Sequence, residues 1–242
     1  NQNNSMRFLE VIVVLLSFAL VMNLSISKSR RKGTSPLILM AILTMLLHLL
    51  IEGYRWQMVP SYLLLGLFTV IRNRESQKTA TVVMSVIWTF SVILPATVPV
   101  IKLPKPTGPF KVGTAIFHWT DTTRTEWFTE ESGDLRKMMI QLWYPANNNS
   151  QNKASPYIDH IDLRAQAIGD RVGLPSFMLD HLNLVKTHSF IEASPIESKE
   201  LFPLIIFSHG LGGMRNQNTV LMEELASTGY AVAAMDHPYD AN

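Results

Sequence analysis

The residues best suited to chemistry form a short glycine-rich loop, His209-Gly-Leu-Gly-Gly213. Gly210, Gly212 and Gly213 allow positive φ angles and leave backbone N–H groups unshielded, so the loop can direct several donors at one anionic atom. A developing oxyanion needs such donors, and so does a bound phosphate. The spacings G-x-x-x-x-G-K-[ST] and G-x-G-x-x-G, which mark phosphate and dinucleotide loops, are both missing. We therefore predict an oxyanion-binding loop, with a plain tight turn as the alternative.

Two strands and a helix must position this loop. Residues 204–207 form a short run of branched apolar residues, which predicts a strand buried on both faces of a parallel sheet. Residues 216–227 place their apolar side chains on one stripe of a helix, and Gly229 follows as a left-handed cap. Residues 231–235 form the second strand. The order strand, loop, helix, strand predicts a right-handed βαβ unit, in which ligands bind at the carboxyl end of the first strand.

Other polar residues near the loop have simpler interpretations. Ser208 and His209 are adjacent, so their side chains diverge if the strand continues; we interpret Ser208 as a loop hydroxyl and His209 as a residue that orients the loop by hydrogen bonding. Asp236, His237 and Asp240 have side chains that metals bind, but the end of a strand favours capping and loop hydrogen bonds. We therefore expect no metal and no cofactor.

Upstream of the loop, the sequence predicts a small set of further elements. Residues 112–117 and 138–144 read as strands of an antiparallel hairpin at the edge of the sheet, with a turn at residues 132–133. Residues 157–169 and 176–185 have the apolar spacing of short helices, each beginning just after a proline. The tryptophans Trp119, Trp127 and Trp143 are interpreted as packing residues.

The distribution of charge divides the 242 residues into two parts. Residues 1–101 carry nine Lys/Arg against three Asp/Glu, whereas residues 102–242 carry twelve against sixteen. Three prolines make residues 102–111 a stiff linker between them. The absence of cysteine excludes a disulfide scaffold and a thiolate zinc site. We therefore expect a membrane region at 1–101, the linker at 102–111, and a mixed soluble domain at 112–242.

Four apolar runs in the first part suggest about four transmembrane helices, at residues 8–26, 36–51, 58–71 and 80–101. The third run is the shortest and spans only if residues 54–57 extend it to the membrane interface. A signal peptide is the rival interpretation of the first run, but basic residues follow it directly, as in a stop-transfer flank. His48 and Glu10 lie within these runs and are interpreted as residues near helix ends rather than as a proton relay.

The orientation follows from the short loops. Residues 28–32 carry four positive charges and residues 72–78 carry three, whereas the turn between the second and third runs carries one. Positive loops stay in the cytoplasm. We therefore expect a multi-pass protein of the cell membrane whose domain after residue 101 is extracytoplasmic, an orientation that reverses if the third run does not span.

The sequence around the glycine-rich loop resembles proteins of the α/β-hydrolase fold, and among them the platelet-activating factor acetylhydrolase-like esterases and lipases. The resemblance is carried by Pro203-Leu-Ile-Ile-Phe-Ser-His-Gly-Leu-Gly-Gly213 and Glu224-Leu-Ala-Ser-Thr-Gly-Tyr-Ala-Val-Ala-Ala-Met-Asp-His237. It implies the N-terminal portion of a mostly parallel sheet with flanking helices. It also implies that the backbone N–H of Leu211 is one donor of an oxyanion hole, in a loop shaped by His209, Gly210, Gly212 and Gly213.

The resemblance implies a serine carboxylic-ester hydrolase, acting on short-acyl or phospholipid-type esters and anchored in the bilayer. No G-x-S-x-G motif occurs in the 242 residues, and the serine, aspartate and histidine of the triad would all follow residue 242. We therefore expect an N-terminal fragment that is inactive by itself. The partners expected are a lipid bilayer and a small ester, without nucleic acid. The alternative is a membrane sensor or transporter component with a degenerate, non-catalytic hydrolase-like domain.

Overall fold

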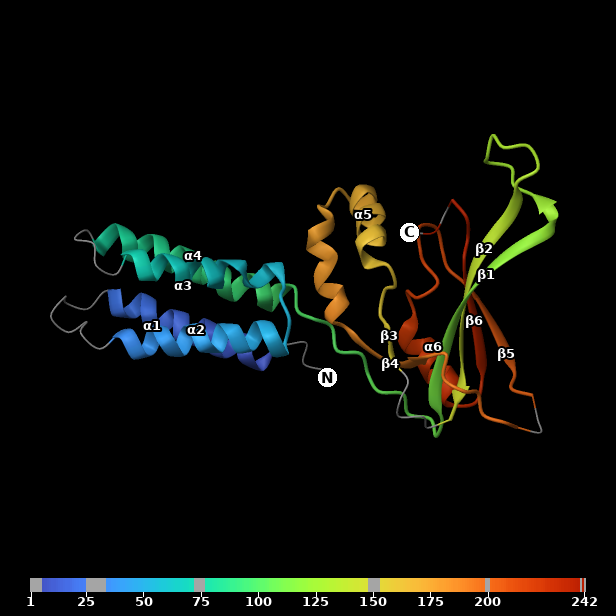
Figure 1. Ribbon diagram of the computed structural model, residues 1–242, viewed down its shortest axis with the longest axis horizontal. Coiled ribbons are helices and arrows are strands. Elements are labelled where there is room, and N and C mark those ends of the chain that lie inside the picture. The colour runs from blue at the N-terminus through green and yellow to red at the C-terminus, as the bar shows by residue number, and fades with distance from the viewer. Residues whose placement is uncertain are drawn as a thin grey trace. The chain divides into compact units, whose positions relative to one another are not determined.

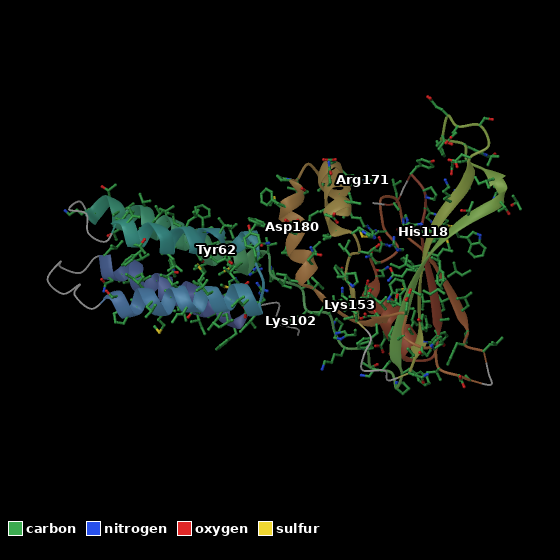
Figure 2. All side chains as sticks on the ribbon, viewed as in Figure 1. Tyr62, Lys102, His118, Lys153, Arg171 and Asp180 are labelled. Carbon is green, nitrogen blue, oxygen red and sulfur yellow. The ribbon has the colours of Figure 1, made fainter. Side chains whose placement is uncertain are left out.

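The computed structural model describes residues 6–24, 34–71, 77–147, 153–198, 201–239 and 241. The chain divides into two compact units (Figure 1; Figure 2 adds the side chains). The helical unit comprises Asn1–Ile101 together with Phe177–Leu184, and the sheet unit comprises Lys102–Ser176 and Val185–Asn242. Each unit has a hydrophobic core of its own.

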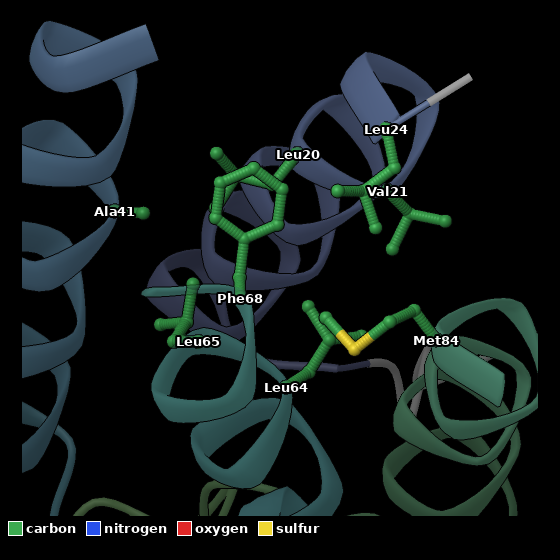
Figure 3. Close-up of a cluster of buried hydrophobic side chains, with 8 residues drawn as sticks. All are labelled: Leu20, Val21, Leu24, Ala41, Leu64, Leu65, Phe68 and Met84. Carbon is green, nitrogen blue, oxygen red and sulfur yellow. The ribbon is translucent and has the colours of Figure 1, made fainter. Parts of the chain in front are cut away.

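The helical unit contains the four predicted apolar runs as helices. They are α1 (Phe8–Leu24), α2 (Thr34–Ile51), α3 (Val59–Ile71) and α4 (Gln77–Thr97), with a 3-10 turn, η2 (Trp56–Met58), before α3. A second 3-10 segment, η3 (Ser176–Leu184), packs here through an edge-on contact between the rings of Phe177 and Trp56. Figure 3 shows the core of the bundle, which consists of Leu20, Val21, Leu24, Ala41, Leu64, Leu65, Phe68 and Met84.

The lengths of the helices do not support the expected four membrane crossings. Among the described residues, Lys78–Thr97 is the one stretch both long and apolar enough to cross a membrane. The apolar helices Phe8–Leu24, Ser35–Ile51 and Trp56–Ile71 are shorter than that. The basic residues that set the expected orientation, other than Lys78, lie outside the described residues.

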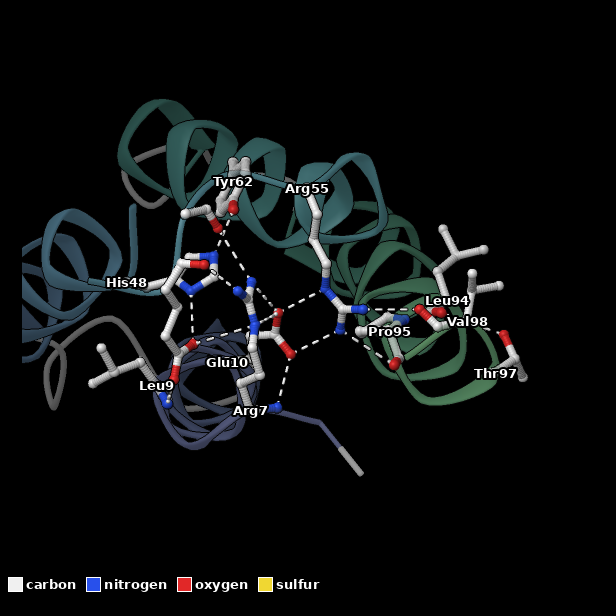
Figure 4. A network of polar contacts seen from close by, with 12 residues as sticks. Arg7, Leu9, Glu10, His48, Arg55, Tyr62, Leu94, Pro95, Thr97 and Val98 are labelled. Atoms are coloured by element: carbon white, nitrogen blue, oxygen red, sulfur yellow. Dashed lines mark hydrogen bonds and ion pairs between the residues drawn. The ribbon is translucent and has the colours of Figure 1, made fainter. Parts of the chain in front are cut away.

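One end of the bundle holds a buried network of charged side chains (Figure 4). The Arg55 guanidinium donates to both carboxylate oxygens of Glu10, at 2.6 and 2.7 Å, and also to the carbonyls of Val98 and Pro95 at the end of α4. Neither the Arg55 nor the Glu10 side chain is exposed. Arg55 therefore neutralises a buried carboxylate and satisfies carbonyls that the end of α4 leaves without intrahelical partners. Glu10 lies in the first turn of α1 and His48 in the last turn of α2, as the sequence predicts, but the sequence does not reveal the network that Glu10 forms with Arg55.

The sheet unit is built on a six-stranded mixed sheet with the order β3-β4-β1-β2-β6-β5 in the described part of the chain. The strands are β1 (Lys111–Thr125), β2 (Leu135–Ala146), β3 (Ala154–Pro156), β4 (Lys186–Ile191), β5 (Leu204–Ser208) and β6 (Ala231–Asp236). Two pairings are parallel, β1 with β4 and β5 with β6, whereas the pairings β1–β2, β2–β6 and β3–β4 are antiparallel. The expectation of a mostly parallel sheet is therefore wrong for this portion.

The positions of two elements differ from the prediction. The β1–β2 hairpin lies in the middle of the sheet and not at its edge, because β4 pairs with β1 and β6 pairs with β2. Conversely, β5 is an edge strand, and its alternating exposure contradicts the prediction of a strand buried on both faces. Short apolar runs do not distinguish an inner strand from an edge strand, since both are rich in branched residues.

Helix α6 (Thr219–Ser227) packs on the sheet and completes the predicted βαβ unit. Met222 and Ala226 of α6 form a core with Val112, Trp143, Val232 and Ala234. Trp143 is therefore a packing residue, whereas Trp119 and Trp127 are 60% and 87% exposed, contrary to the prediction. The linker is attached to the end of α6: the amide of Thr107 donates to the Glu224 carboxylate, and that of Gly108 to the Ser227 hydroxyl. The remaining helix is α5 (Ile161–Val172).

Two consecutive glutamates of α6 have opposite environments. Glu223 is completely buried, and its Oε1 accepts the backbone N–H of His188 in β4 at 2.8 Å. Burial raises the pKa of Glu223 above its ordinary value of 4.5, although the amide of His188 opposes the shift. Glu224 lies at the surface, where the hydroxyl and amide of Thr107 lower its pKa.

These environments predict opposite pH dependence for two substitutions. A carboxyl whose pKa is raised by folding favours the native state below its unfolded pKa and loses that contribution as the pH rises toward the folded pKa. Glu223→Gln, which retains the Oε1 acceptor, should therefore gain stability relative to the wild type as the pH rises above 4.5. Glu224→Gln, the matched control, should instead lose relative stability as the pH rises toward 4.5 from below and then stay level, because its carboxyl has a lowered pKa. Urea unfolding of the three proteins at pH 3 to 7 measures both trends, and parallel curves would contradict the assignment.

Candidate active site

The glycine-rich loop begins where β5 ends and contains a well-defined turn. The N–H of Gly213 donates to the carbonyl of Gly210 at 2.9 Å. Gly212, the third residue of this turn, has φ 67°, whereas Leu211 is not among the residues with positive φ. This is the pattern of a type II turn, which requires glycine or asparagine at its third position. The turn bond uses the N–H of Gly213 and leaves that of Leu211, the second residue, available to another acceptor.

Conformation restricts the loop to glycine at position 212, and lack of space does so at position 213, where a Cβ atom would lie 2.9 Å from the carbonyl oxygen of Gly210. A Cβ atom on Gly212 would lie 2.6 Å from Cζ of Arg171, which belongs to the last turn of α5. A Cβ atom on Gly213 would lie 2.4 Å from Oε1 of Gln217 and 2.9 Å from Cβ of His209. The backbone at Gly212 and Gly213 is therefore packed against other residues, while the Leu211 side chain is 89% exposed.

Two histidines and a serine meet behind the turn. Nε2 of buried His209 accepts the backbone N–H of His237 at 3.2 Å, and its Nδ1 lies 2.8 Å from the carbonyl of Gly210. Because Nε2 accepts, the proton belongs on Nδ1, which donates to Gly210. His209 thus joins the loop to the chain after β6. Ser208 Oγ lies 2.7 Å from Nε2 of His237, a contact between the ends of two adjacent parallel strands.

A buried ion cluster holds the far side of the loop. The backbone N–H of Arg215 donates to Oδ1 of Asp236 at 2.6 Å, and its guanidinium binds the carboxylates of both Asp236 and Asp159. Arg164 from α5 also binds Asp159, at 2.7 Å. The Arg215 side chain is 1% exposed and each aspartate 14%. The cluster fixes the loop to the carboxyl end of β6 and to the segment before α5.

The sequence placed only part of this site. The end of β5, the glycine turn and Asp236 belong to one contiguous segment and could be assigned from it. Arg215 and Asp159 were missed, because 56 residues separate them and no local pattern links them. Asp236 binds the guanidinium of Arg215, and Asp240 lies outside the described residues. The oxyanion role of Leu211 and the shaping role of His209, Gly210, Gly212 and Gly213 stay predictions.

One group of side chains in the described part of the chain has ligand atoms close enough to hold a metal ion, namely Glu10, His48 and Glu52 of the helical unit. Their atoms lie within 4.8 Å of one another. Arg7 and Arg55 both bind the Glu10 carboxylate, however, and a cation would have to displace them. His48 is placed between Glu52 and the Tyr62 hydroxyl, at 3.0 and 2.8 Å. The arrangement is explained as an ionic network of the protein alone.

Comparison with known proteins supplies context for this geometry. A family described as "Platelet-activating factor acetylhydrolase, isoform II" matches residues 96–241. Platelet-activating factor acetylhydrolase of Cavia porcellus is 34% identical over 140 residues, covering 56% of this chain and 28% of that protein. The enzyme of the same name from Canis lupus familiaris is 48% identical over 44 residues, which are 18% of this chain and 10% of that one. The chain thus spans less than a third of these relatives.

A solved structure is also similar in sequence. Ferulic acid esterase from Streptomyces cinnamoneus is 33% identical, with a TM-score of 0.46, and the match covers 58% of this chain and 37% of that one.

The ion cluster predicts a large effect of one substitution. Arg215→Met removes the guanidinium that binds both aspartates and leaves Arg164, at 2.7 Å from Asp159 and 3.9 Å from Asp236, to compensate two largely buried carboxylates. It should therefore lower the free energy of unfolding by about 3 kcal/mol, the lower end of the range for a broken buried ion pair. Lys137→Met is the matched control, because Lys137 pairs with Asp134 at 3.2 Å but is 71% exposed. Its cost should be within about 1 kcal/mol. Denaturant titrations compare the two variants, and equal costs would show that the cluster does not stabilise the fold.

Proposed function

The chain belongs to the platelet-activating factor acetylhydrolase isoform II family, and from that premise we propose that it is the N-terminal part of a membrane-anchored serine ester hydrolase. The substrates proposed are short-acyl or phospholipid-type esters. The observation that carries the proposal is the type II turn at residues 210–213, which keeps the Leu211 N–H out of the turn hydrogen bond.

The proposed role of the loop is to stabilise negative charge on the reacting carbonyl oxygen. A serine encoded after residue 242 attacks the ester carbonyl, and a histidine accepts its proton. The Leu211 N–H donates to the oxyanion of the tetrahedral intermediate, and the residue after the serine supplies the second donor. Within the described residues, the Arg215 cluster and the bond from His237 to His209 hold the loop in place, so that the donor needs no reorganisation during the reaction.

We also propose that the helical unit lies in the cell membrane as a multi-pass bundle. Apolar side chains cover its outside as well as its core, for example Phe8, Leu50 and Ile51, which are 75%, 82% and 71% exposed. A helix that is apolar all round is suited to lipid. Helices shorter than the bilayer are accommodated by local thinning or by residues at the interface. The positive charges at residues 28–32 and 72–78 support an orientation with the sheet unit outside the cytoplasm.

A matched pair of substitutions tests the oxyanion role in the product of the whole reading frame that contains these residues. Proline is common at the second position of a type II turn, so Leu211→Pro should keep the turn and remove only the N–H. Leu211→Ala keeps the N–H. With a short-chain aryl ester, Leu211→Pro should lower kcat by about 100- to 1,000-fold, while Leu211→Ala should stay within about threefold of the wild type. A serine-directed phosphonate should abolish wild-type turnover.

Equal activity of the two Leu211 variants would remove the loop from the mechanism. A wild-type product that neither turns over esters nor reacts with the phosphonate would overturn the hydrolase and favour the non-catalytic membrane component.

The orientation is tested by thiol labelling, since the chain contains no cysteine. Ser132→Cys in the sheet unit should react with a membrane-impermeant maleimide in intact cells. Ser29→Cys, between the first two apolar runs, should react only after permeabilisation. The reverse pattern would place the sheet unit in the cytoplasm.

A further inference from the structure

The β1–β2 hairpin extends beyond the other strands at the end of the sheet where β5 and β6 terminate and the glycine-rich loop begins. The pairing of β2 with β6 stops at Met139 and Asp236, where β6 ends. The strands β1 and β2 continue to pair beyond that point and, after an irregularity, as far as Thr125 and Leu135. Since β5 and β6 are parallel, the carboxyl ends of both strands face this part of the hairpin. Figure 1 shows the two ribbons of the hairpin continuing past their neighbours. The tip, residues 126–134, therefore projects from the same side of the sheet as the loop.

The tip carries two consecutive aromatic residues that the described fold does not bury. Trp127 is 87% exposed and Phe128 is 76% exposed. The Phe128 ring lies 5.1 Å from the ring of Tyr239, which follows β6 and is itself 62% exposed. Together with Leu211 of the loop, these side chains form exposed apolar surface at the end of the sheet where β5 and β6 terminate. Tryptophan and tyrosine are favoured at the headgroup level of a bilayer, where an amphipathic ring is partly immersed.

The charge of the hairpin determines which lipid surface fits it. Its outer part carries five carboxylates against three cations: Asp121, Glu126, Glu130, Glu131 and Asp134 against Arg124, Arg136 and Lys137. Arg124 and Lys137 are already paired with Asp121 and Asp134, at 2.5 and 3.2 Å. Binding of anionic lipids relies on clusters of unneutralised basic residues, and this hairpin has the opposite balance. A zwitterionic surface presents no net charge to repel it.

We propose that Trp127 and Phe128 anchor the sheet unit on a zwitterionic lipid surface. The end of the sheet that carries residues 209–213 then faces the lipid. The contact itself does not require catalysis. Its consequence does rest on the proposed function: an anchor at this end brings the loop to esters that reside in the lipid, so that the acyl group need not leave the surface completely before it reaches the site. Exposed aromatic residues at the other end of the strands would not bring the loop to the lipid.

The test uses the full reading frame, reconstituted in phosphatidylcholine vesicles with and without brominated acyl chains, which quench nearby fluorophores. The 242 residues contain no cysteine, and any cysteine elsewhere in the reading frame is replaced by serine, so that a single introduced thiol carries the fluorophore. Glu130→Cys places it on the tip and leaves both aromatic residues intact. Leu201→Cys is the control, since Leu201 is 97% exposed and precedes the amino end of β5, which is the end of the strand away from the glycine-rich loop.

Brominated lipid should reduce the emission of the tip label by about twofold or more and change that of the Leu201 label by less than about a tenth, as expected for a tip at headgroup depth. Adding Trp127→Ser and Phe128→Ser should abolish the quenching at the tip. Replacing half of the phosphatidylcholine with phosphatidylglycerol should weaken it. The proposal would be overturned by equal quenching at both positions or by quenching that survives the loss of the two aromatic residues. It would also be overturned if the emission of the tip label changed with protein concentration but not with brominated lipid, which would indicate contact between protein copies.

An activity measurement separates this proposal from the hydrolase assignment. Trp127→Ser/Phe128→Ser should raise the apparent KM for an ester carried in vesicles and leave the hydrolysis of a water-soluble ester unchanged. Failure of the wild type to hydrolyse either ester would refute the hydrolase, while the quenching result would still decide on the anchor.

Discussion

The conformation of the glycine-rich loop depends on one buried guanidinium. Arg215 joins the segment after β5 to the end of β6 and to the chain before α5, through Asp236 and Asp159. A glycine-rich segment has more backbone freedom to lose on folding than any other, so a type II turn at its centre persists only where its surroundings hold it. Ion pairs in a largely buried site have directional contacts that an apolar core does not provide. The turn is thereby fixed without a side chain at residues 212 and 213.

The sequence predicted those features that arise within a short segment. The βαβ unit from Leu204 to Asp236 has strand, turn and helix signals next to one another, and the structure confirms each of them. The order of strands was not predictable in this way. Whether β5 lies inside the sheet or at its edge depends on which other strands pair with it, and branched residues suit both positions. The same reason explains why the β1–β2 hairpin was assigned to an edge.

Long-range polar contacts were the second kind of feature that the sequence did not reveal. Glu10, Arg55 and the end of α4 are far apart along the chain, and each residue alone has an ordinary explanation at a helix end. Their meeting in one network depends on the packing of the bundle. The sequence also did not reveal which tryptophans are exposed: Trp127 and Trp143 were both interpreted as packing residues, yet Trp127 projects from a hairpin tip and Trp143 lies in the core with α6.

The assignment of Phe177–Leu184 to the helical unit affects how the two units are connected. The residues on either side of this segment belong to the sheet unit, so the polypeptide passes between the units three times, after residues 101, 176 and 184. Trp56 binds the segment by donating its indole N–H to the carbonyl of Met178 at 3.1 Å. No single junction in the chain therefore separates the two units from each other. A chimera that exchanged only residues 1–101 would leave the segment Phe177–Leu184 without the Trp56 indole that it binds.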